Sequence, residues 1–218
     1  QKTDALRRNH VCFAKPLDYE RRMSAADSKG RLFTFLLTDR FGMFSLSAAI
    51  DVIRSANRLS GKDFYAWKTV SATGAPVTAS NHMRINVDHS IADMPQSDIL
   101  FVSCSFSTDV PDTARILAAL RAVGRRGGAL GGLVLGSEML ADAGLMTGYR
   151  CTIHWENRAA FREKYPDIEC TGNIFEIDRK RYSCAGGTTA IDLMLEIIRT
   201  DLGPALAAEV ANQFQHER

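Results

Sequence analysis

One short stretch of the sequence has the composition of a site at which α/β proteins present a reactive group. Residues Gly131–Leu145 read GGLVLGSEMLADAGL, which predicts a buried strand, an abrupt turn at Gly136 and a helix that runs into Ala143. A sharp strand-to-helix turn presents one residue, often a nucleophile, at the top of the sheet. Here the turn offers Val134 and Leu135, which have neither a lone pair nor a proton to give. The stretch therefore predicts this geometry without its usual covalent chemistry.

Two other side chains have groups that could react near such a turn. Cys104 ends an apolar run and opens a small polar loop, Ser105-Phe106-Ser107. Packing is the default interpretation of Cys104, although its thiol is the only plausible substitute nucleophile near the turn. His154 is either a buried histidine satisfied by its neighbours or a donor that orients a ligand carboxylate or a water. A general base has nothing to act on without a nucleophile beside it.

Four aromatic side chains follow or flank the predicted strand ends. Phe41, Phe44, Phe106 and Trp155 have the spacing of ordinary core residues, yet three of the segments that carry them border the expected crevice. An aromatic face stabilises an ammonium or guanidinium group by roughly 0.5–2 kcal/mol. A cationic or zwitterionic ligand is therefore the functional alternative to a purely structural role.

The elements that must position these groups alternate along the chain. Apolar runs predict strands and i, i+3, i+4 spacing predicts helices, which together indicate a mostly parallel sheet between helices, an α/β fold. The expected strands are 31–38, 64–71, 98–103, 131–134, 149–155, 168–171, 174–177 and 182–184, and the expected helices are 45–59, 111–123, 136–143, 156–165, 188–198 and one after Gly203.

Ligands of such sheets bind beyond the carboxyl ends of the strands. Four strand ends are therefore expected to form the lip of a crevice, at 40–41, 103–106, 134–136 and 185–187, with 154–155 as a possible fifth segment. The candidate binding residues are Phe41, Phe44, Ser103, Cys104, Ser105, Phe106, Val134, Leu135, Gly136, His154 and Trp155.

Several further features concern single elements. Pro111 is expected in the first turn of its helix, where a missing N–H does no harm. The charged residues 178–181 are expected to form a solvated hairpin tip. Leu206, Val210 and Phe214 form an apolar stripe on the last helix, which either packs on the core or serves as a dimer face.

The composition of the 218 residues excludes several classes of protein. Lys and Arg number 27 against 25 Asp and Glu, a net charge of +2, which provides no strong field for nucleic acid or anionic lipid. No run of about 18 apolar residues predicts a membrane span. Five scattered cysteines without a C-x-x-C pair indicate free thiols in a reducing cytoplasm, and no disulfide frame, metal or cofactor is expected.

Four segments together resemble one known group of proteins. They are Leu133–Leu145, Gly148–Glu156, Phe175–Asp178 and Cys184–Met194. These runs are similar to the N-terminal sensor domain of AraC-type transcriptional regulators, a domain built like a class I glutamine amidotransferase or PfpI-type protease. The resemblance extends from about Arg31 to the end of the chain and is greatest for arginine-responsive and betaine- or carnitine-responsive members.

The resemblance implies a flavodoxin-like three-layer α/β/α sandwich whose ancestral active site has been dismantled. The position of the catalytic cysteine falls on Val134, that of the carboxylate near Ser45, and that of the histidine on His154, so two of the three groups are missing. It also implies a catalytically inactive homodimer that binds a small amino-acid-like or quaternary-amine effector. DNA contact would come only from a helix-turn-helix pair that follows residue 218.

The corresponding division of the chain is an N-terminal extension at 1–30, a sensor domain at 31–202 and a C-terminal helix at 203–218 that leads to the DNA-binding part. Two alternatives remain open on the sequence alone. One is an amidase, other PfpI-like hydrolase or hydratase with an atypical nucleophile, for which Cys104 is the candidate. The other is a dimerisation module whose pocket is filled by its own side chains.

Overall fold

The apolar runs of the sequence form the centre of a seven-stranded sheet. The computed structural model describes residues 30–216. The strand order of the sheet is β10-β11-β7-β6-β1-β2-β5. Every neighbouring pair is parallel except the β10–β11 hairpin. The strands are β1 (Arg31–Leu37), β2 (Tyr65–Ser71), β5 (His89–Ser90), β6 (Ile99–Cys104), β7 (Ala129–Val134), β10 (Phe175–Asp178) and β11 (Arg181–Cys184).

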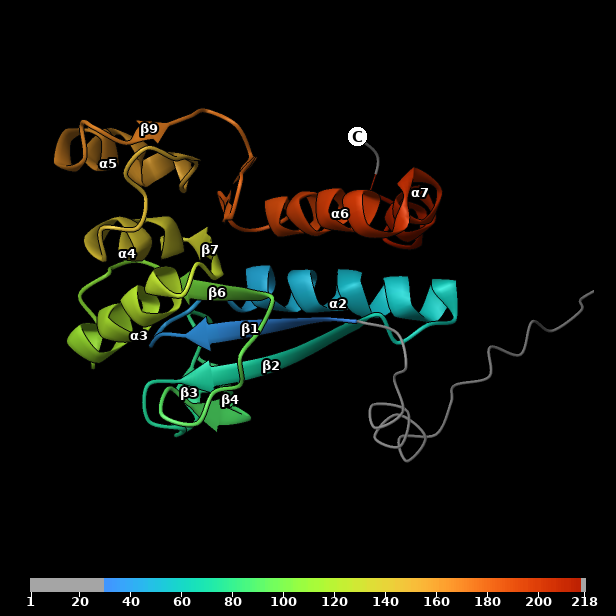
Figure 1. The fold of residues 1–218 in the computed structure, drawn as a ribbon, viewed down its shortest axis with the longest axis horizontal. Helices are drawn as coiled ribbons and strands as arrows, with labels where there is room; N and C mark the ends of the chain where they lie inside the picture. The colour runs from blue at the N-terminus through green and yellow to red at the C-terminus, as the bar shows by residue number, and fades with distance from the viewer. Residues whose placement is uncertain (1–29, 217–218) are drawn as a thin grey trace, which may run out of the picture.

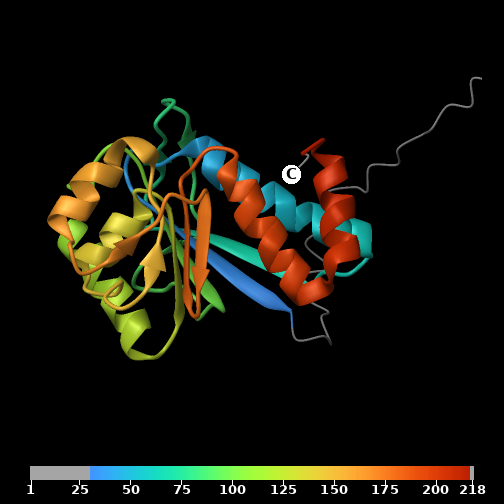
Figure 2. The ribbon, with the colours of Figure 1, turned by 90° about the horizontal axis from the view of Figure 1, so that it is seen from above.

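Helices cover both faces of the sheet (Figures 1 and 2). One layer consists of α2 (Met43–Ser60), α6 (Thr189–Leu202) and α7 (Pro204–Gln213), and the other of α3 (Thr113–Arg125), α4 (Gly136–Asp142) and α5 (Arg158–Lys164). Two small strand pairs lie outside the main sheet. The antiparallel pair is β3 (Val77–Thr78) with β4 (Arg84–Ile85), and the parallel pair is β8 (Arg150–Cys151) with β9 (Glu169–Cys170). The predicted α/β class and its three layers are confirmed.

Alternate residues of β1 enter two separate cores. Phe33, Phe35 and Leu37 pack with α2, α6 and α7, whereas Leu36 packs with α3 and α4 on the opposite face. All four side chains are at most 1% exposed. A strand buried on both faces favours apolar residues at almost every position, which explains the nearly continuous apolar run that only the buried Thr34 interrupts.

The turn at the centre of the fold lies two residues before the predicted position. Val134 has a left-handed φ of 62°, Leu135 precedes the helix, and Gly136 is already the first residue of α4. The prediction of a turn at Gly136 is therefore wrong. A Cβ atom at Gly136 would lie 2.1 Å from the carbonyl oxygen of Val102, so this glycine lets α4 approach β6 closely rather than providing the turn.

Two further predictions about elements are wrong. The expected strand 149–155 is reduced to β8, and a single 3-10 turn, η1 (Trp155–Asn157), precedes α5. After β8 the amide of Thr152 donates to the Ser183 hydroxyl at 3.0 Å, so side chains replace a neighbouring strand as partners. Pro111 lies before α3, because Asp112 has a φ of 61°, a left-handed conformation that a helix cannot include.

The last helix packs on the core. Val210 is fully buried, and Leu206 and Phe214 lie against the cluster shared by α2 and α6. Of the two alternatives for this apolar stripe, the structure supports packing on the core. The start of β1 is tied to the same region, since Arg31 Nη1 lies 2.6 Å from Asp201 Oδ2 and the Tyr65 hydroxyl donates to that oxygen at 3.0 Å.

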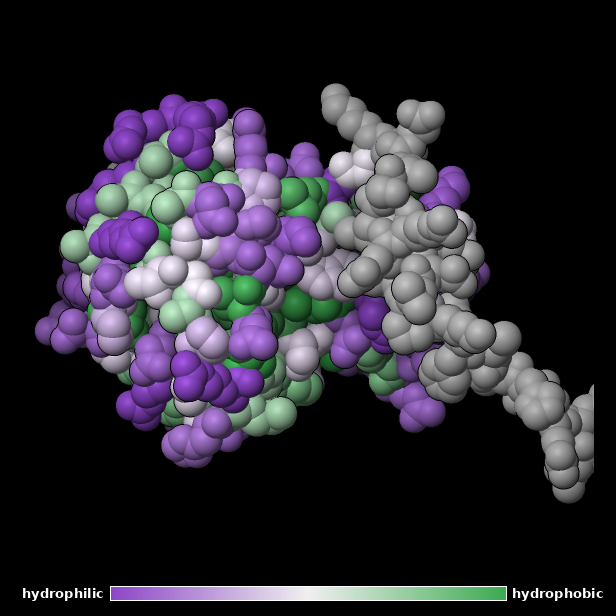
Figure 3. Space-filling model, turned by 90° about the horizontal axis from the view of Figure 1, so that it is seen from below, coloured by the Kyte–Doolittle hydropathy of each residue, from purple (hydrophilic) through white to green (hydrophobic). Residues whose placement is uncertain are grey.

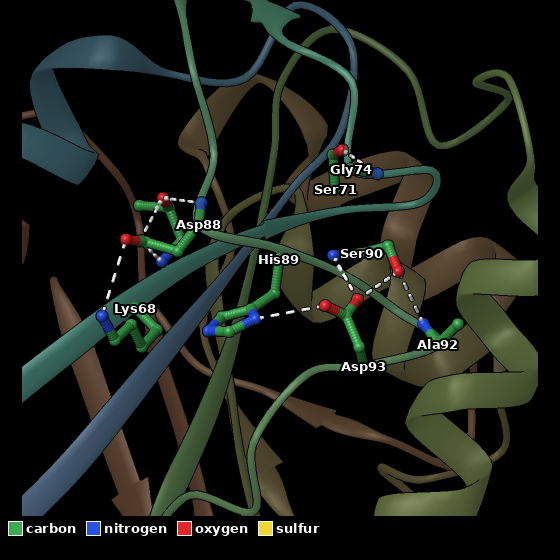
Figure 4. Close-up of polar contacts among 9 residues, drawn as sticks. Lys68, Ser71, Gly74, Asp88, His89, Ser90, Ala92 and Asp93 are labelled. Atoms are coloured by element: carbon green, nitrogen blue, oxygen red, sulfur yellow. Dashed lines mark hydrogen bonds and ion pairs between the residues drawn. The ribbon is translucent and has the colours of Figure 1, made fainter.

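Two carboxylates secure the two-residue edge strand β5 (Figure 4). Asp88 accepts hydrogen bonds from the amide and the hydroxyl of Thr69, both at 2.8 Å. Asp93 accepts from the amide of Ser90 at 2.8 Å and from its hydroxyl, and contacts His89 Nδ1 at 3.3 Å. The hydrogen bonds from Ser90, followed by that from His89, lower the pKa of Asp93 to about 2.

The surface seen from below, in Figure 3, mixes hydrophilic and hydrophobic residues. The hydrophobic residues drawn there form small groups separated by hydrophilic ones. Within residues 30–216 no helix combines the length and the apolar character needed to cross a membrane. The N-terminal extension up to residue 29, including Cys12, lies outside the described residues.

Candidate functional site

A cavity of about 360 Å3 lies at the carboxyl ends of the central strands, where the sequence places the crevice. Its walls come from the segments that follow β1, β6, β7, β8 and β11, together with the β3–β4 loop. The lining residues are Gly42, Met43, Phe44, Ser45, Ser80, Ser105, Phe106, Val134, Leu135, His154, Glu156, Asn157, Gly186 and Gly187. A larger hollow of about 680 Å3 lies beside β10, but one strand with its flanking turn forms most of its wall.

Val134 occupies the floor of the cavity at the strand-to-helix turn. A β-branched residue with φ of 62° is strained, at a cost on the order of 1–3 kcal/mol. A Cβ atom at Gly186 would lie 2.8 Å from Val134 Cγ2, and one at Gly42 would lie 3.4 Å from the same methyl group. The two glycine-containing loops therefore close around the valine side chain, which offers no group for covalent chemistry.

Ser45 stands near the position that the family resemblance assigns to the carboxylate. Its hydroxyl accepts a hydrogen bond from the amide of Gly187 at 2.8 Å, and the residue is 2% exposed. This contact joins the first turn of α2 to the loop before α6. The hydroxyl therefore holds two walls of the cavity together.

His154 lines the cavity but is not the buried histidine that the sequence allowed. Its side chain is 32% exposed, and its Nδ1 lies 3.7 Å from Glu156 Oε2, a long contact between exposed groups. The Trp155 ring lies 5.9 Å from the imidazole, centroid to centroid. With Val134 at the turn, the imidazole can donate or accept a hydrogen bond but has no nucleophile to activate.

Cys104, the substitute nucleophile, lies beneath the cavity and does not line it. Its side chain is fully buried, and the thiol donates to the carbonyl oxygen of Ser107 at 3.0 Å. Burial, with added repulsion from Glu138 and Asp142, raises the pKa of this thiol to about 11. A thiol that stays protonated at neutral pH is a poor nucleophile, so the structure argues against the role considered for Cys104.

The eleven predicted site residues separate into three groups. Six of them line the cavity: Phe44, Ser105, Phe106, Val134, Leu135 and His154. Phe41, Ser103, Cys104 and Gly136 are buried beneath it, and Trp155 is exposed beside His154 without lining it.

Eight lining residues were not among the predicted candidates: Gly42, Met43, Ser45, Ser80, Glu156, Asn157, Gly186 and Gly187. Of these, Gly186 and Gly187 lie in the segment 185–187 that was expected at the lip of the crevice. Glu156 and Asn157 could have been inferred by extending the 154–155 segment by one turn. Ser80 had no such signal, because its position depends on a hydrogen bond from its amide to the carbonyl of Phe41 at 2.8 Å. That contact folds the β3–β4 loop over the cavity.

The electrostatic environment of the cavity has two parts. The N-terminal ends of α2, α4 and α6 meet at its floor, through Gly42, Leu135 and the Gly186–Gly187 loop. Helix N-termini carry partial positive charge and free N–H groups, which favour an anion. Within residues 30–216 no group of three His, Cys, Asp or Glu side chains is placed to hold a metal ion.

The mouth of the cavity is aromatic. Phe44 is 57% exposed and Phe106 is 65% exposed, values unusual for large hydrophobic residues of this protein. The guanidinium carbon of Arg40 lies 4.9 Å from the centre of the Phe106 ring. The mouth therefore combines apolar faces, a cation and the Glu156 carboxylate above a floor that favours an anion.

A parallel α/β sandwich with a sharp turn at one strand end defines the class I glutamine amidotransferase-like fold, here without a thiol at the turn. The chain belongs to the DJ-1/PfpI family, whose sequence pattern matches residues 34–200. The architecture agrees with Drosophila melanogaster DJ-1beta, with a TM-score of 0.73 at 17% identity over 87% of this chain and 100% of that chain. At that identity the likeness concerns the fold alone.

Within this family the chain has the form of the domain found in AraC-type transcription regulators. It is 43% identical over 182 residues to the HTH-type transcriptional regulator CdhR of Pseudomonas aeruginosa, covering 84% of this chain and 54% of that protein. GbdR of the same species is 38% identical, with 84% and 50% covered. The crystal structure of an AraC family regulator from Pseudomonas putida superimposes with a TM-score of 0.77 at 31% identity, over 84% of this chain and 99% of that chain. The chain spans about half the length of the curated relatives.

Proposed function

We propose that this chain is the effector-sensing and dimerising domain of an AraC-type transcriptional regulator and has no catalytic activity of its own. The observation that carries the proposal is a cavity at the strand ends whose floor presents Val134 instead of a nucleophile. Similarity to CdhR and GbdR supports the regulatory role. In such a regulator, the segment that begins with α7 would lead to a helix-turn-helix pair that contacts DNA.

The chemistry of the cavity favours a small zwitterion, either amino-acid-like or a quaternary amine. The N-terminal end of α2 at the floor suits a carboxylate, whereas the first amides of α6 already donate to the loop before it. The exposed faces of Phe44 and Phe106 suit an ammonium group, and Glu156 adds a negative charge at the same rim. About 360 Å3 is enough for a metabolite of this size. An open cavity also counts against the alternative of a module that binds no ligand.

The proposed absence of catalysis rests on the side chains around the turn. Covalent catalysis in this geometry needs an activated nucleophile within reach of a base. The cavity wall offers Val134 at the turn, while Cys104 and Cys184 are buried thiols whose pKa values burial raises to about 11. No observation in the structure favours the amidase or hydratase alternative.

Isothermal titration calorimetry with arginine, glycine betaine, carnitine and dimethylglycine tests the proposal. We expect saturable binding of at least one compound, weakened roughly threefold to thirtyfold by Phe106→Ala or Phe44→Ala, the range that corresponds to one lost cation–π contact. Ile174→Ala is the matched control, because Ile174 is also half-exposed (49%) but lies away from the cavity. Absence of binding to all four compounds would refute the small-amine effector.

A further inference from the structure

Two thiols face each other outside the cavity, on the small β8–β9 sheet. Cys151 and Cys170 are direct partners in this parallel pair. Side chains at paired positions point to the same side of a sheet, so the two thiols lie next to each other. Both belong to the core cluster on the α3–α4 side. The function proposed above makes no use of either residue.

The spacing of this pair suits a disulfide. Neighbouring strands lie about 4.7–4.9 Å apart, within the range of Cα–Cα distances that disulfides span. The ladder fixes Cys151 opposite Cys170, so little backbone movement is needed to join the sulfur atoms. Cys104 and Cys184 have no cysteine opposite them in the described sheet, where Val134 pairs with Cys104 and Leu133 and Phe175 pair with Cys184.

The surroundings of the pair distinguish the two sulfur atoms. The hydrogen bond from Cys151 lowers the pKa of Cys170 despite its burial, and the charges of Arg162 and Arg158 lower it further. The corresponding contact raises the pKa of Cys151. Arg162 is held in place by hydrogen bonds to the carbonyl oxygen of Cys170 at 3.0 and 2.6 Å.

Arg158 supplies a second, independent sign that this corner favours negative charge. Its Nε is buried and has no hydrogen-bond partner among the described residues. A buried donor without a partner costs free energy, and a thiolate on the neighbouring Cys170 would reduce that cost electrostatically. Cys170 keeps a small exposed surface of 6%, whereas Cys151 is fully buried. Cys170 is therefore the sulfur that a small oxidant reaches first.

We infer that Cys151 and Cys170 form an oxidisable dithiol, a site of reversible disulfide formation by a peroxide. The Cys170 thiolate attacks a peroxide oxygen, the O–O bond breaks, and a sulfenic acid and hydroxide form. The Cys151 sulfur then attacks the Cys170 sulfur, loses its proton and displaces hydroxide, which leaves as water. Two thiols lose two electrons and two protons, and hydrogen peroxide becomes two water molecules.

The disulfide would close a loop that includes part of the cavity wall. His154, Glu156 and Asn157 lie between the two cysteines in the sequence and line the cavity. Joining both ends of this segment restricts its opening. The thiol chemistry itself is independent of the proposed effector, so failure of either proposal can be recognised separately.

Peptide mapping of the folded protein tests the inference. The background variant Cys12→Ser removes the cysteine outside the described residues. This protein is treated with a small excess of hydrogen peroxide, blocked with iodoacetamide and digested with trypsin without reduction. Cleavage after Arg150, Arg158, Lys164 and Arg179 places the two cysteines on separate peptides, 151–158 and 165–179. We expect these peptides joined, with the loss of two hydrogen atoms, and released by dithiothreitol. Their recovery as separate alkylated peptides would overturn the inference.

A second measurement needs no oxidant. In the reduced protein we expect iodoacetamide to modify Cys170 at least about tenfold faster than Cys104 at neutral pH, since alkylation follows thiolate content and access. Equal or slower modification of Cys170 would contradict its assignment as the attacking sulfur. Cys104→Ser is the matched control that should keep the disulfide, whereas Cys151→Ser should leave a Cys170 sulfenic acid that dimedone traps.

Discussion

Val134 holds the backbone conformation that presents a nucleophile in enzymes of this fold, with an unreactive side chain. Replacing Val134 by cysteine places a thiol at this turn, beside the N-terminal end of α4. Ser45 lies near the position that the family resemblance assigns to the carboxylate, and its hydroxyl accepts a hydrogen bond from the amide of Gly187 at 2.8 Å. We therefore expect Val134→Cys to gain a thiol that iodoacetamide labels but no turnover of ester or amide substrates.

The measurement is hydrolysis of chromogenic esters and amides by the folded variant, with Val134→Ser as the control of similar size. Equal and negligible rates for wild type, Val134→Cys and Val134→Ser agree with a dismantled site. A Cys variant that turns over many equivalents of substrate would show that His154 and the loops around it still form working catalytic machinery.

Individual site residues were predictable where a strand end fixes them. Val134 ends a predicted strand and Ser105 follows another, and both line the cavity because parallel strands bring their carboxyl ends to one edge. His154 also lines the cavity, although the strand predicted around it is reduced to β8. The same rule wrongly places Phe41, Ser103 and Cys104 in the cavity wall, since these residues are buried beneath the cavity. The strand β6 is covered by helices on both faces, so its consecutive last residues Ser103 and Cys104 are both buried, and the cavity begins only at Ser105.

The contact between α4 and β6 depends on Gly136, although its φ needs no glycine. In Gly136→Ala the new Cβ would lie 2.1 Å from the Val102 carbonyl oxygen, so the backbone of α4 or β6 must move. We expect a loss of about 3 kcal/mol in the free energy of unfolding, measured with urea. Gly172→Ala is the matched control, because Gly172 is exposed and its nearest contact would be Arg158 Nη1 at 3.5 Å. Equal stability of the two variants would contradict the close approach.

The edge strand β5 gives stability that depends on pH. The pKa of Asp93 is lowered to about 2 by hydrogen bonds from Ser90 and His89, whereas an unfolded aspartate titrates near 4. A carboxylate with a lowered folded-state pKa stabilises the fold above pH ~4, and this contribution disappears as pH falls toward 2. We expect Asp93→Asn to unfold at lower urea concentration than wild type at pH 7.

Urea unfolding of wild type and Asp93→Asn across this pH range checks the sign, because the difference should shrink as the solution becomes acidic. Asp167→Asn is the control, since the exposed Asp167 makes no hydrogen bond or ion pair with the described residues. A difference that stays constant from pH 7 to pH 3 would mean that Asp93 acts through packing rather than charge.

Whole elements were predictable when burial imposed a pattern. The nearly continuous apolar run of β1 and the 3.6-residue period of α2 each follow from faces that must be buried. The stretch after Cys151 was mistaken for a strand, because its β-prone residues are stabilised by Ser183 and Asn173 rather than by a neighbouring strand. Such long-range partners leave no local signal in the sequence.

At the scale of the whole molecule, α6 connects the two ends of the proposed regulatory mechanism. The loop before its N-terminus forms part of the cavity wall, and its residue Asp192 lies 3.1 Å from His216, which follows α7. A ligand in the cavity would therefore contact the loop that leads into the helix to which His216 is bound. This arrangement gives effector binding a structural route to the part of the protein that follows.

If effector binding changes the arrangement of a homodimer, effector binding and dimerisation are coupled. Dimerisation must then change effector affinity by the same factor by which the effector changes dimerisation. Two-fold association is the commonest symmetry of oligomers, and regulators with helix-turn-helix units read paired half-sites as dimers. We expect sedimentation velocity to show a concentration-dependent dimer of this chain, with a dissociation constant that the effector changes.

The same coupling makes a prediction about effector affinity. Measured at protein concentrations well below and well above the dimer dissociation constant, the affinity should differ in proportion to the change that the effector causes in that dissociation constant. The Leu206–Val210–Phe214 stripe is packed on the core of its own subunit. Variants for these measurements should therefore leave this stripe unchanged. A monomer at every concentration would refute dimerisation by this domain. Equal affinities in both regimes would show instead that the dimer forms without sensing the effector, and signal transfer would then have to pass within one subunit along α6.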